Sequence, residues 1–471
     1  MSLFGLLVLA CALARPAACV QHSGYLSVAT PRAELEVFYA HVEHPDASLP
    51  LIVWMNGGPG ASSLTGFFTE LGPNLLNSRG APEPRSGSNW TLEHNPWAWS
   101  TLGSLLVWEQ PAGVGFSRCA GGRDCEFGWD DDSAADANLA TLRAFYGAHP
   151  SAASRDLYIA GESYAGIYVP MLATRVLAHN HARAKSPIRL RGVMVGNGCI
   201  GYGVSGGCGT DALDLFVTTL ERAAVGVSRG LLAAARTRCD GELESGKSVA
   251  ELSAPCAAAM RDLSEEVGAY NVYHWASPCG PDGQGDWGDG RGFACAGDLL
   301  STYLADRHVQ SALGVISPNE PTRRWMQWDG TMPKYNITLA DAQPAYRELL
   351  ASGVRVLVYN GLADTGVPAV GAEKWVPRVG GHVAHARRKW GAPPDGRFAG
   401  YATTYTAGLT FVTVDGAGHL VPADRPQAAH AMVSAFLSAE PMPTYRGATC
   451  TPLWLGRGWG DLCPSSERRV D

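Results

Sequence analysis

A serine in a turn of small residues is the first candidate for chemistry in this sequence. Residues 161–166 read Gly-Glu-Ser-Tyr-Ala-Gly, so Ser163 lies two positions after Gly161 and two before Ala165. Small residues at these positions permit the sharp strand-to-helix turn that lifts a serine hydroxyl out of a sheet. A serine that only capped a helix would need no such turn. We therefore interpret Ser163 as a nucleophile.

A serine nucleophile needs a neighbouring base, and the base needs a carboxylate that orients it. Asp364 ends the turn Asn-Gly-Leu-Ala-Asp after one apolar run, and His419 ends Asp-Gly-Ala-Gly-His after another. Considered alone, Asp364 would be a turn residue and His419 one of thirteen histidines. Together they follow Ser163 in the order Ser, Asp, His that α/β-hydrolases use.

A glycine-rich loop is a candidate site for the negative charge that develops in such a reaction. Residues 54–60 read Trp-Met-Asn-Gly-Gly-Pro-Gly and follow an apolar run. Adjacent glycines let backbone N–H groups point at an oxyanion without obstruction by side chains. The alternative is a tight loop that merely tolerates Gly and Pro.

The elements that must position these residues are predicted from short apolar runs. Six runs, rich in β-branched residues and followed by glycine-containing turns, are typical of buried parallel strands. They cover residues 51–55, 105–108, 157–160, 193–195, 354–359 and 409–414. Helix-length segments occur at 130–146 and 165–178, and Pro170 is expected to kink or interrupt the second. We predict an α/β fold with a mostly parallel central sheet flanked by helices.

The composition changes between about residues 199 and 295. This segment carries six cysteines, alanine-rich stretches and the run Gly-Pro-Asp-Gly-Gln-Gly-Asp-Trp-Gly-Asp-Gly-Arg-Gly. We expect a disulfide-rich, partly helical cap inserted into a single domain that spans residues 20–471. Ligand clefts of open sheets lie beyond the carboxyl ends of the strands, so such a cap would shape substrate access.

The first residues are predicted to be a secretory signal peptide over residues 1–19. An apolar run from Leu3 to Ala14 is too short to span a bilayer and is followed by the small residues Ala17, Ala18 and Cys19. A buried N-terminal helix is the alternative. No later stretch has the roughly 18 apolar residues of a transmembrane helix. The expected destination is the secretory pathway, and then a vacuole, a lysosome or the outside of the cell.

Cysteine usage agrees with export. Ten of the twelve cysteines follow residue 19, no CxxC pair occurs, and disulfides are therefore expected. Near neighbours that could close small loops are Cys119 and Cys125, Cys199 and Cys208, and Cys450 and Cys463. The connectivity of Cys239, Cys256, Cys279 and Cys295 stays open. Asn89 and Asn336 begin glycosylation sequons, which would be used in a secretory lumen.

Charge and composition exclude several classes of protein. The chain has 37 basic and 44 acidic residues, a net charge of −7 and 46% hydrophobic residues, which excludes a disordered chain. Without long basic runs, no nucleic-acid partner is expected. His382 and His385 have a spacing that could hold zinc, but no Cys or carboxylate accompanies them. We expect neither a metal nor a cofactor.

Many phrases in one order make the chain similar to the serine carboxypeptidases, a family with the α/β-hydrolase fold. They run from His-Ser-Gly-Tyr-Leu at residue 22 through WMNGGPGASS, NPWAW, EQPAGVGFS, YIAGESYAGIYVP and GVMVGNG to YLADRHVQSALGV, VLVYNGLADTGVP and GYATTYTAGLTFVTVDGAGHLVP. The resemblance implies that Ser163, Asp364 and His419 form a catalytic triad. It also implies that the N–H groups of Gly58 and Tyr164 form the oxyanion hole.

The resemblance further implies a site for the terminal carboxylate of a peptide substrate. Its residues would be Asn56, Gly57, Glu70 and Glu162, with Trp54 nearby. Acidic groups facing a substrate carboxylate cannot all be ionised, so one or both glutamates should have a raised pKa and donate a hydrogen bond. Binding would then be favoured at acidic pH. Without the resemblance, both glutamates would be interpreted as ordinary solvated or turn residues.

The function expected is removal of the last residue of peptides or proteins through an acyl-enzyme, favoured at acidic pH. Two alternatives stay open: an acyltransferase of the same fold, and a non-catalytic protein that binds or protects a partner. The partners expected are peptide or protein C-termini, and a homodimer stays open.

Overall fold

The computed structural model describes residues 20–77, 90–121, 125, 127–182, 187–223, 227–268, 271–275, 297–325, 334–447, 451–454 and 459–462. Several predictions concern residues outside these ranges. They are the signal peptide at 1–19, the sequon residue Asn89, and the four cysteines Cys279, Cys295, Cys450 and Cys463. Within the described ranges, no helix combines the length and the apolar character that crossing a bilayer requires.

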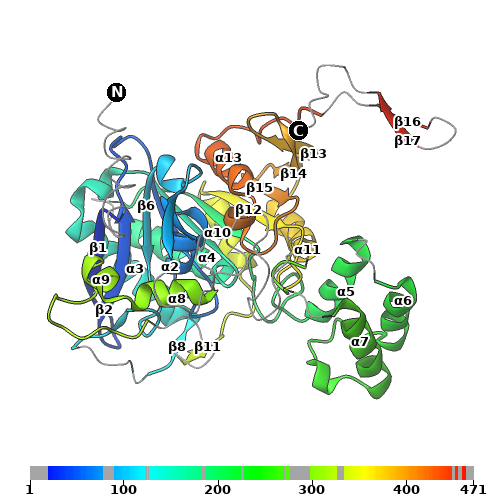
Figure 1. The fold of residues 1–471 in the computed structure, drawn as a ribbon, viewed down its shortest axis with the longest axis horizontal. Helices are drawn as coiled ribbons and strands as arrows, with labels where there is room; N and C mark the ends of the chain where they lie inside the picture. The colour runs from blue at the N-terminus through cyan, green and yellow to red at the C-terminus, as the bar shows by residue number, and fades with distance from the viewer. Residues whose placement is uncertain are drawn as a thin grey trace.

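A mixed sheet of eleven strands forms the centre of the molecule (Figure 1). Adjacent parallel strands occupy its middle, in the order β6 (Ser104–Trp108), β3 (Leu51–Met55), β9 (Leu157–Glu162), β10 (Leu190–Gly196), β12 (Arg355–Gly361) and β15 (Leu409–Val414). These are the strands that the six apolar runs predict. The expected α/β architecture is therefore confirmed.

Antiparallel strands flank this parallel centre on both sides. One side carries β2 (Glu34–Val42), which pairs with β6, β1 (His22–Ala29) and the short β7 (Arg118–Cys119). The other side carries β14 (Arg397–Tyr405), which pairs with β15, and β13 (Val383–Ala392). The apolar runs did not predict these strands, because polar residues interrupt the apolar ones along them, as in β2, which reads ELEVFYAHV.

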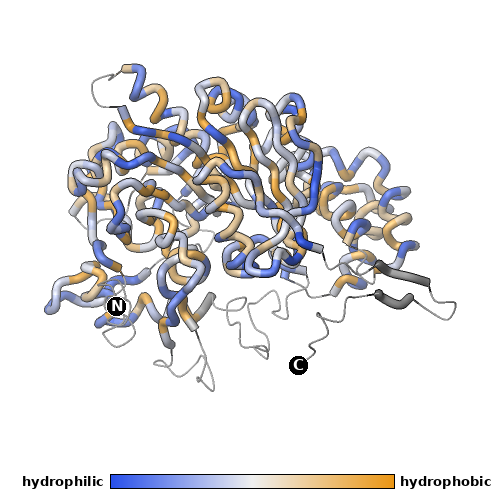
Figure 2. The backbone as a smooth tube through the Cα atoms, turned by 90° about the horizontal axis from the view of Figure 1, so that it is seen from above, coloured by the Kyte–Doolittle hydropathy of each residue, from blue (hydrophilic) through white to orange (hydrophobic). Residues whose placement is uncertain are grey.

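Helices cover both faces of the sheet, so that two cores form. One face packs against α3 (Asp131–Ala148), α4 (Ala165–Ala182), α10 (Gln343–Ala351) and α11 (Ala369–Gly380). The other packs against α2 (Leu64–Gly66), the π-helical turn η1 (Phe67–Leu71), α8 (Gly297–Ala305), α9 (Arg307–Ala312) and α13 (Pro426–Leu437). In Figure 2, hydrophobic stretches recur along the segments in the middle of the molecule.

Strand β3 shows why the parallel strands are mainly apolar. Its residues Leu51, Val53 and Met55 belong to one core, whereas Ile52 and Trp54 belong to the other. A strand buried on both faces presents its side chains to a core on either side, so most of its residues are apolar.

Short elements complete the described chain. They are β4 (Asn74–Asn77), β5 (Thr91–His94), η2 (Trp99–Thr101), β8 (Trp129–Asp130), η3 (Pro150–Ser154), η4 (Val249–Glu251), β11 (Tyr335–Asn336), α12 (Val421–Asp424), β16 (Thr451–Trp454) and β17 (Trp459–Leu462).

Within the segment between β10 and α8, residues 212–223 and 227–268 form a helical lobe beside the main body, next to α11 (Figure 1). Its helices are α5 (Ala212–Ala223), α6 (Arg229–Arg238) and α7 (Ala254–Val267), which share an apolar core of their own. A disulfide between Cys239 and Cys256 lies in that core. The disulfides Cys119–Cys125 and Cys199–Cys208, which sequence proximity suggested, are both present.

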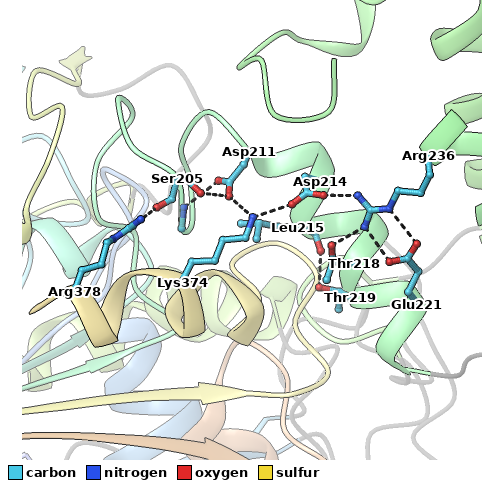
Figure 3. A network of polar contacts seen from close by, with 11 residues as sticks. Ser205, Asp211, Asp214, Leu215, Thr218, Thr219, Glu221, Arg236, Lys374 and Arg378 are labelled. Atoms are coloured by element: carbon cyan, nitrogen blue, oxygen red, sulfur yellow. Dashed lines mark hydrogen bonds and ion pairs between the residues drawn. The ribbon is translucent and has the colours of Figure 1, made fainter. Parts of the chain in front are cut away.

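Ion pairs attach this lobe to the body (Figure 3). Lys374 of α11 lies 2.9 Å from Asp211 and 2.8 Å from Asp214. Asp214 also pairs with Arg236 of α6, so one carboxylate links two lobe helices to the body. Since Asp211 and Asp214 are largely buried, their charges need these partners.

Of the two effects expected of Pro170, a kink or an interruption, the structure excludes the interruption, because α4 continues through it. Proline has no N–H for the carbonyl oxygen four residues earlier, which here belongs to Gly166. The hydroxyl group of the buried Tyr346 in α10 donates to that oxygen instead, at 2.8 Å. A neighbouring helix thus supplies the missing donor.

This replacement predicts a dependence between two substitutions. Tyr346→Phe should destabilise the protein by about 1–3 kcal/mol, because it leaves the buried Gly166 carbonyl group without a donor. In a Pro170→Ala background the restored N–H can donate to Gly166, so the same change should cost less. Denaturant unfolding of the four proteins measures both costs, and equal costs would contradict this account.

Candidate active site

The expected site residues lie at one edge of the sheet. Ser163 directly follows β9, Asp364 follows β12, and His419 follows β15. The glycine-rich loop follows β3. These strands are mutually parallel, so their carboxyl ends meet at the edge where ligands of open α/β sheets bind.

Ser163 has a left-handed backbone, with φ of 63°, between β9 and α4. A non-glycine residue in this region is strained by about 1–3 kcal/mol, and such strain occurs at functional sites. Gly161 shows why the turn needs small residues. A Cβ atom there would lie 2.4 Å from the Met55 carbonyl oxygen and 2.6 Å from the Cβ atom of Ala165. The turn expected from the sequence pattern is therefore present.

Asp364 and His419 are in direct contact. Nδ1 of His419 lies 2.6 Å from Oδ2 of Asp364, and both side chains are buried. With Nδ1 held in this way, Nε2 is the nitrogen left for a reacting hydroxyl group. Among the described residues, no hydrogen bond joins Ser163 to His419. Such contacts are often long before substrate binds and tighten in the complex.

Asn197 completes this arrangement, although sequence reasoning did not select it. It directly follows β10, and its side-chain amide donates to Oδ2 of Asp364 at 2.7 Å. Its Oδ1 accepts a hydrogen bond from the Gly361 N–H at 3.0 Å. The residue before it, Gly196, accepts a hydrogen bond from the Ser163 N–H at 3.0 Å. One turn therefore contacts both the serine turn and the aspartate. Its place at the end of a predicted strand was the available signal.

A segment of the insertion, Asn271–Trp275, also reaches the site. The Tyr273 ring stacks on the His419 ring at a centroid distance of 4.5 Å, and its carbonyl oxygen accepts the His419 N–H at 2.7 Å. The Val272 carbonyl oxygen accepts hydrogen bonds from the N–H and hydroxyl groups of Thr365, which follows Asp364. This segment therefore holds the aspartate and histidine loops together. No motif in the sequence indicated it.

The glycine-rich loop packs against the start of α4. A Cβ atom on Gly57 would lie 2.3 Å from the Tyr164 nitrogen, so only glycine permits this approach. Gly58 has φ of 104°, a conformation that favours glycine. Within the described residues, the N–H groups of Gly58 and Tyr164 donate no hydrogen bond, so both can serve an oxyanion. The Tyr164 side chain is held by Asp131, at 2.6 Å from its hydroxyl group.

Two buried carboxyl groups lie beside this loop. Nδ2 of Asn56 lies 2.8 Å from Oε1 of Glu162 and 3.4 Å from Oε1 of Glu70. Oδ1 of Asn56 accepts hydrogen bonds from the Trp54 indole at 2.8 Å and from the Gly66 N–H at 3.1 Å, which orients the amide. The exposed fractions of Glu70 and Glu162 are only 1% and 3%.

These carboxyl groups favour their protonated forms. Burial raises the pKa of Glu70 to about 7. Burial, together with the neighbouring Glu70, raises the pKa of Glu162 well above its ordinary value. Oε2 of each glutamate is buried without a hydrogen-bond partner in the described chain. A protonated carboxyl group here could donate to a ligand carboxylate.

The remaining predicted site residue within the described ranges is Asn336. It lies exposed in β11, where a glycan could be attached. Glycosylation of Asn336 stays a prediction.

The sequence of this chain is similar to those of known proteins. The family model described as serine carboxypeptidase matches residues 13–439. Serine carboxypeptidase-like 40 of Arabidopsis thaliana is 32% identical over 437 residues, which cover 91% of this chain and 81% of that protein. Serine carboxypeptidase 1 of Hordeum vulgare is 29% identical over 461 residues, covering 89% of each chain.

A solved structure supports the fold. Kex1(delta)p, a prohormone-processing carboxypeptidase from Saccharomyces cerevisiae, superposes with a TM-score of 0.67 at 22% identity and covers 96% of both chains. With the strand order and the serine turn, this establishes the α/β-hydrolase fold. The match of the family model over most of the sequence establishes more than the fold: the chain belongs to the serine carboxypeptidase family.

Proposed function

We propose that the protein is a serine carboxypeptidase that removes the last residue of a peptide through an acyl-enzyme. The observation that carries this proposal is the buried carboxyl pair Glu70 and Glu162, held by Asn56 directly beside the Ser163 turn. A hydrolase acting on internal bonds needs no group that recognises a free carboxylate. Two protonated carboxyl groups next to a nucleophile suit a substrate whose terminal carboxylate lies one residue from the scissile bond.

The geometry supports a defined sequence of steps. Ser163 Oγ attacks the carbonyl carbon of the last peptide bond while Nε2 of His419 takes its proton. The N–H groups of Gly58 and Tyr164 stabilise the oxyanion. Asp364 keeps the imidazole oriented and stabilises its charged form. The proton then passes to the leaving amino acid. Water next attacks the acyl-enzyme in the same way, with His419 as the base, and releases the shortened peptide from Ser163.

Binding of the terminal carboxylate should involve Asn56, the Gly57 backbone, Glu70 and Glu162, with Trp54 orienting the amide of Asn56. The proposed site of action is a compartment of the secretory pathway or the outside of the cell. Disulfides, of which the described chain has three, persist in such oxidising compartments.

The direct test measures release of C-terminal amino acids from a blocked dipeptide. The protein should trim a dipeptide with a free carboxylate, and the matched C-terminal amide should be a poor substrate. Ser163→Ala should lower kcat by about 10⁴-fold or more and abolish labelling by a fluorophosphonate. Faster transfer of an acyl group from an acyl-glucose donor to an alcohol would identify an acyltransferase instead. Failure of the intact chain to react with the fluorophosphonate would contradict both activities.

The carboxyl pair predicts how KM depends on pH. Below the pKa of about 7, Glu70 is protonated and can donate to the substrate carboxylate; as pH rises through that value the donor becomes a repelling charge. KM for the blocked dipeptide should therefore rise about tenfold or more between pH 5 and pH 8, whereas KM for an ester without a carboxylate should change little.

Glu70→Gln should flatten this rise, because an amide donates at every pH. Glu109→Gln is the matched control, since burial raises the pKa of Glu109 to about 7 as well, but its carboxylate binds Ser62, Phe116 and Trp325. The control should keep the rise of KM. A pH-independent KM in the unmodified protein would refute the role of the pair.

Asn197 should act by positioning Asp364. Asn197→Ala removes a hydrogen bond to a carboxylate, worth about 1.5–3 kcal/mol, so kcat should fall about 10- to 100-fold with little change in KM. Asn360→Ala is the matched control, because Asn360 is also buried in this region and, like Asn197, donates to the Val367 carbonyl group, but only Asn197 donates to Asp364. Its kcat should fall far less. Equal losses in the two variants would show that Asn197 has only a structural role.

A further inference from the structure

Three histidines that the proposed reaction does not use converge at one corner of the fold. His22 begins β1, His41 lies in β2, and His149 directly follows α3. One ring nitrogen from each lies within 4.8 Å of the other two. The ring centroids are 5.7 Å apart for His22 and His41, 5.1 Å for His22 and His149, and 5.4 Å for His41 and His149. The three imidazoles thus surround a common centre.

His41 lacks the partners that a buried polar side chain normally has. Its exposed fraction is 1%, and neither ring nitrogen has a hydrogen-bond partner in the described chain. Buried polar atoms without partners are rare in folded proteins and call for an explanation such as a bound ion.

The surroundings of His149 resemble the outer sphere of a metal site. The Tyr39 hydroxyl group lies 2.9 Å from Nε2 of His149, while its Nδ1 makes no hydrogen bond with a described residue. A hydrogen bond to one nitrogen orients the ring so that the other can bind a metal. The Phe145 ring packs on His41 at 5.0 Å and on His149 at 4.7 Å, which limits access of water from that side.

A carboxylate lies beside the open side of the cluster. Oε2 of Glu43 is 4.0 Å from Nε2 of His22. Arg155 lies 3.8 Å from Glu43 and donates to the carbonyl groups of His44, Asp46 and Leu49, which hold its side chain in place.

We propose that His22, His41 and His149 bind one Zn²⁺ ion, with Glu43 or a water molecule as the fourth ligand. Imidazole and carboxylate ligands in a four-coordinate site suit Zn²⁺. Zn–N bonds of about 2.0–2.1 Å place tetrahedral nitrogens about 3.4 Å apart, so the cluster must contract from its present spacing. His22 and His149 can rotate inward because both are partly exposed, whereas His41 is fixed by packing.

The position of the cluster indicates a structural role. His41 pairs with Leu106 in β6 while Tyr39 pairs with Trp108, so His41 lies toward the amino-terminal ends of the parallel strands. The candidate active site lies at their carboxyl ends. A metal here would clamp the β1–β2 pair to the end of α3, without contact with the reacting groups.

The test uses the full-length protein after dialysis against a chelator. Isothermal titration with Zn²⁺ should show one equivalent bound, and Zn²⁺ should raise Tm. Co²⁺ should give the visible absorption of a tetrahedral nitrogen site. Loss of an outer-sphere partner weakens metal binding about 10- to 100-fold. His22→Ala and His149→Ala should each weaken Zn²⁺ binding more than that, because each removes a ligand. Carboxypeptidase activity should not change on metal removal when it is measured at a temperature below the Tm of both the metal-free and the Zn²⁺-bound protein.

His382→Ala/His385→Ala is the matched control. These two histidines are exposed at β13, which forms the opposite edge of the sheet from β1. The control should bind Zn²⁺ as tightly as the unmodified protein. The proposal is overturned if the unmodified protein binds no Zn²⁺, if His22→Ala and His149→Ala both bind with unchanged affinity, or if only the control loses binding. In each case the three rings would be an aromatic packing cluster.

Discussion

The contacts of Asp364 are the constraint on which the candidate site depends. This carboxylate is fully buried, and four groups donate to it: the His419 ring, the Asn197 amide, and the N–H groups of Gly366 and Val367. A buried carboxylate without donors would be strongly unfavourable. Its donors follow three different strands, so satisfying one side chain also fixes the relative positions of the loops after β10, β12 and β15.

The carboxyl pair at the same sheet edge has the opposite environment. Glu70 and Glu162 share one amide group, that of Asn56, and each keeps a buried oxygen without a partner in the described chain. One edge of the sheet therefore combines two kinds of carboxyl group. Asp364 accepts several hydrogen bonds and can hold an imidazole as a carboxylate. Glu70 and Glu162 accept few hydrogen bonds and favour the protonated form. Such a difference between environments is how one fold supports both roles for a carboxyl group.

The parts of this site that the sequence predicted share a physical cause. Strands buried on both faces are continuous apolar runs, and the polar residue after each run lies at the functional edge, which is how Ser163, Asp364 and His419 were selected. Strands β13 and β14 were missed because polar residues interrupt their apolar pattern. The continuity of α4 through Pro170 could not be predicted, because the substitute donor is Tyr346, about 180 residues away along the chain. Tyr273 was missed because its role arises only from tertiary contacts, whereas Asn197 follows a predicted strand but belongs to no motif of the triad.

The segment Asn271–Trp275 connects the insertion to the catalytic loops through tertiary contacts that its position in the sequence does not indicate. It follows the helical lobe along the chain, yet its backbone bonds to the loops of both Asp364 and His419, and the Tyr273 ring covers the imidazole. Gly418 shows how close this contact is, because a Cβ atom there would lie 2.2 Å from the Tyr273 carbonyl oxygen. The lobe is attached to α11 by Lys374, and α11 begins five residues after Asp364. The insertion is therefore anchored on both sides of the aspartate loop, so a shift of the lobe would act on the geometry of the site as well as on access to it.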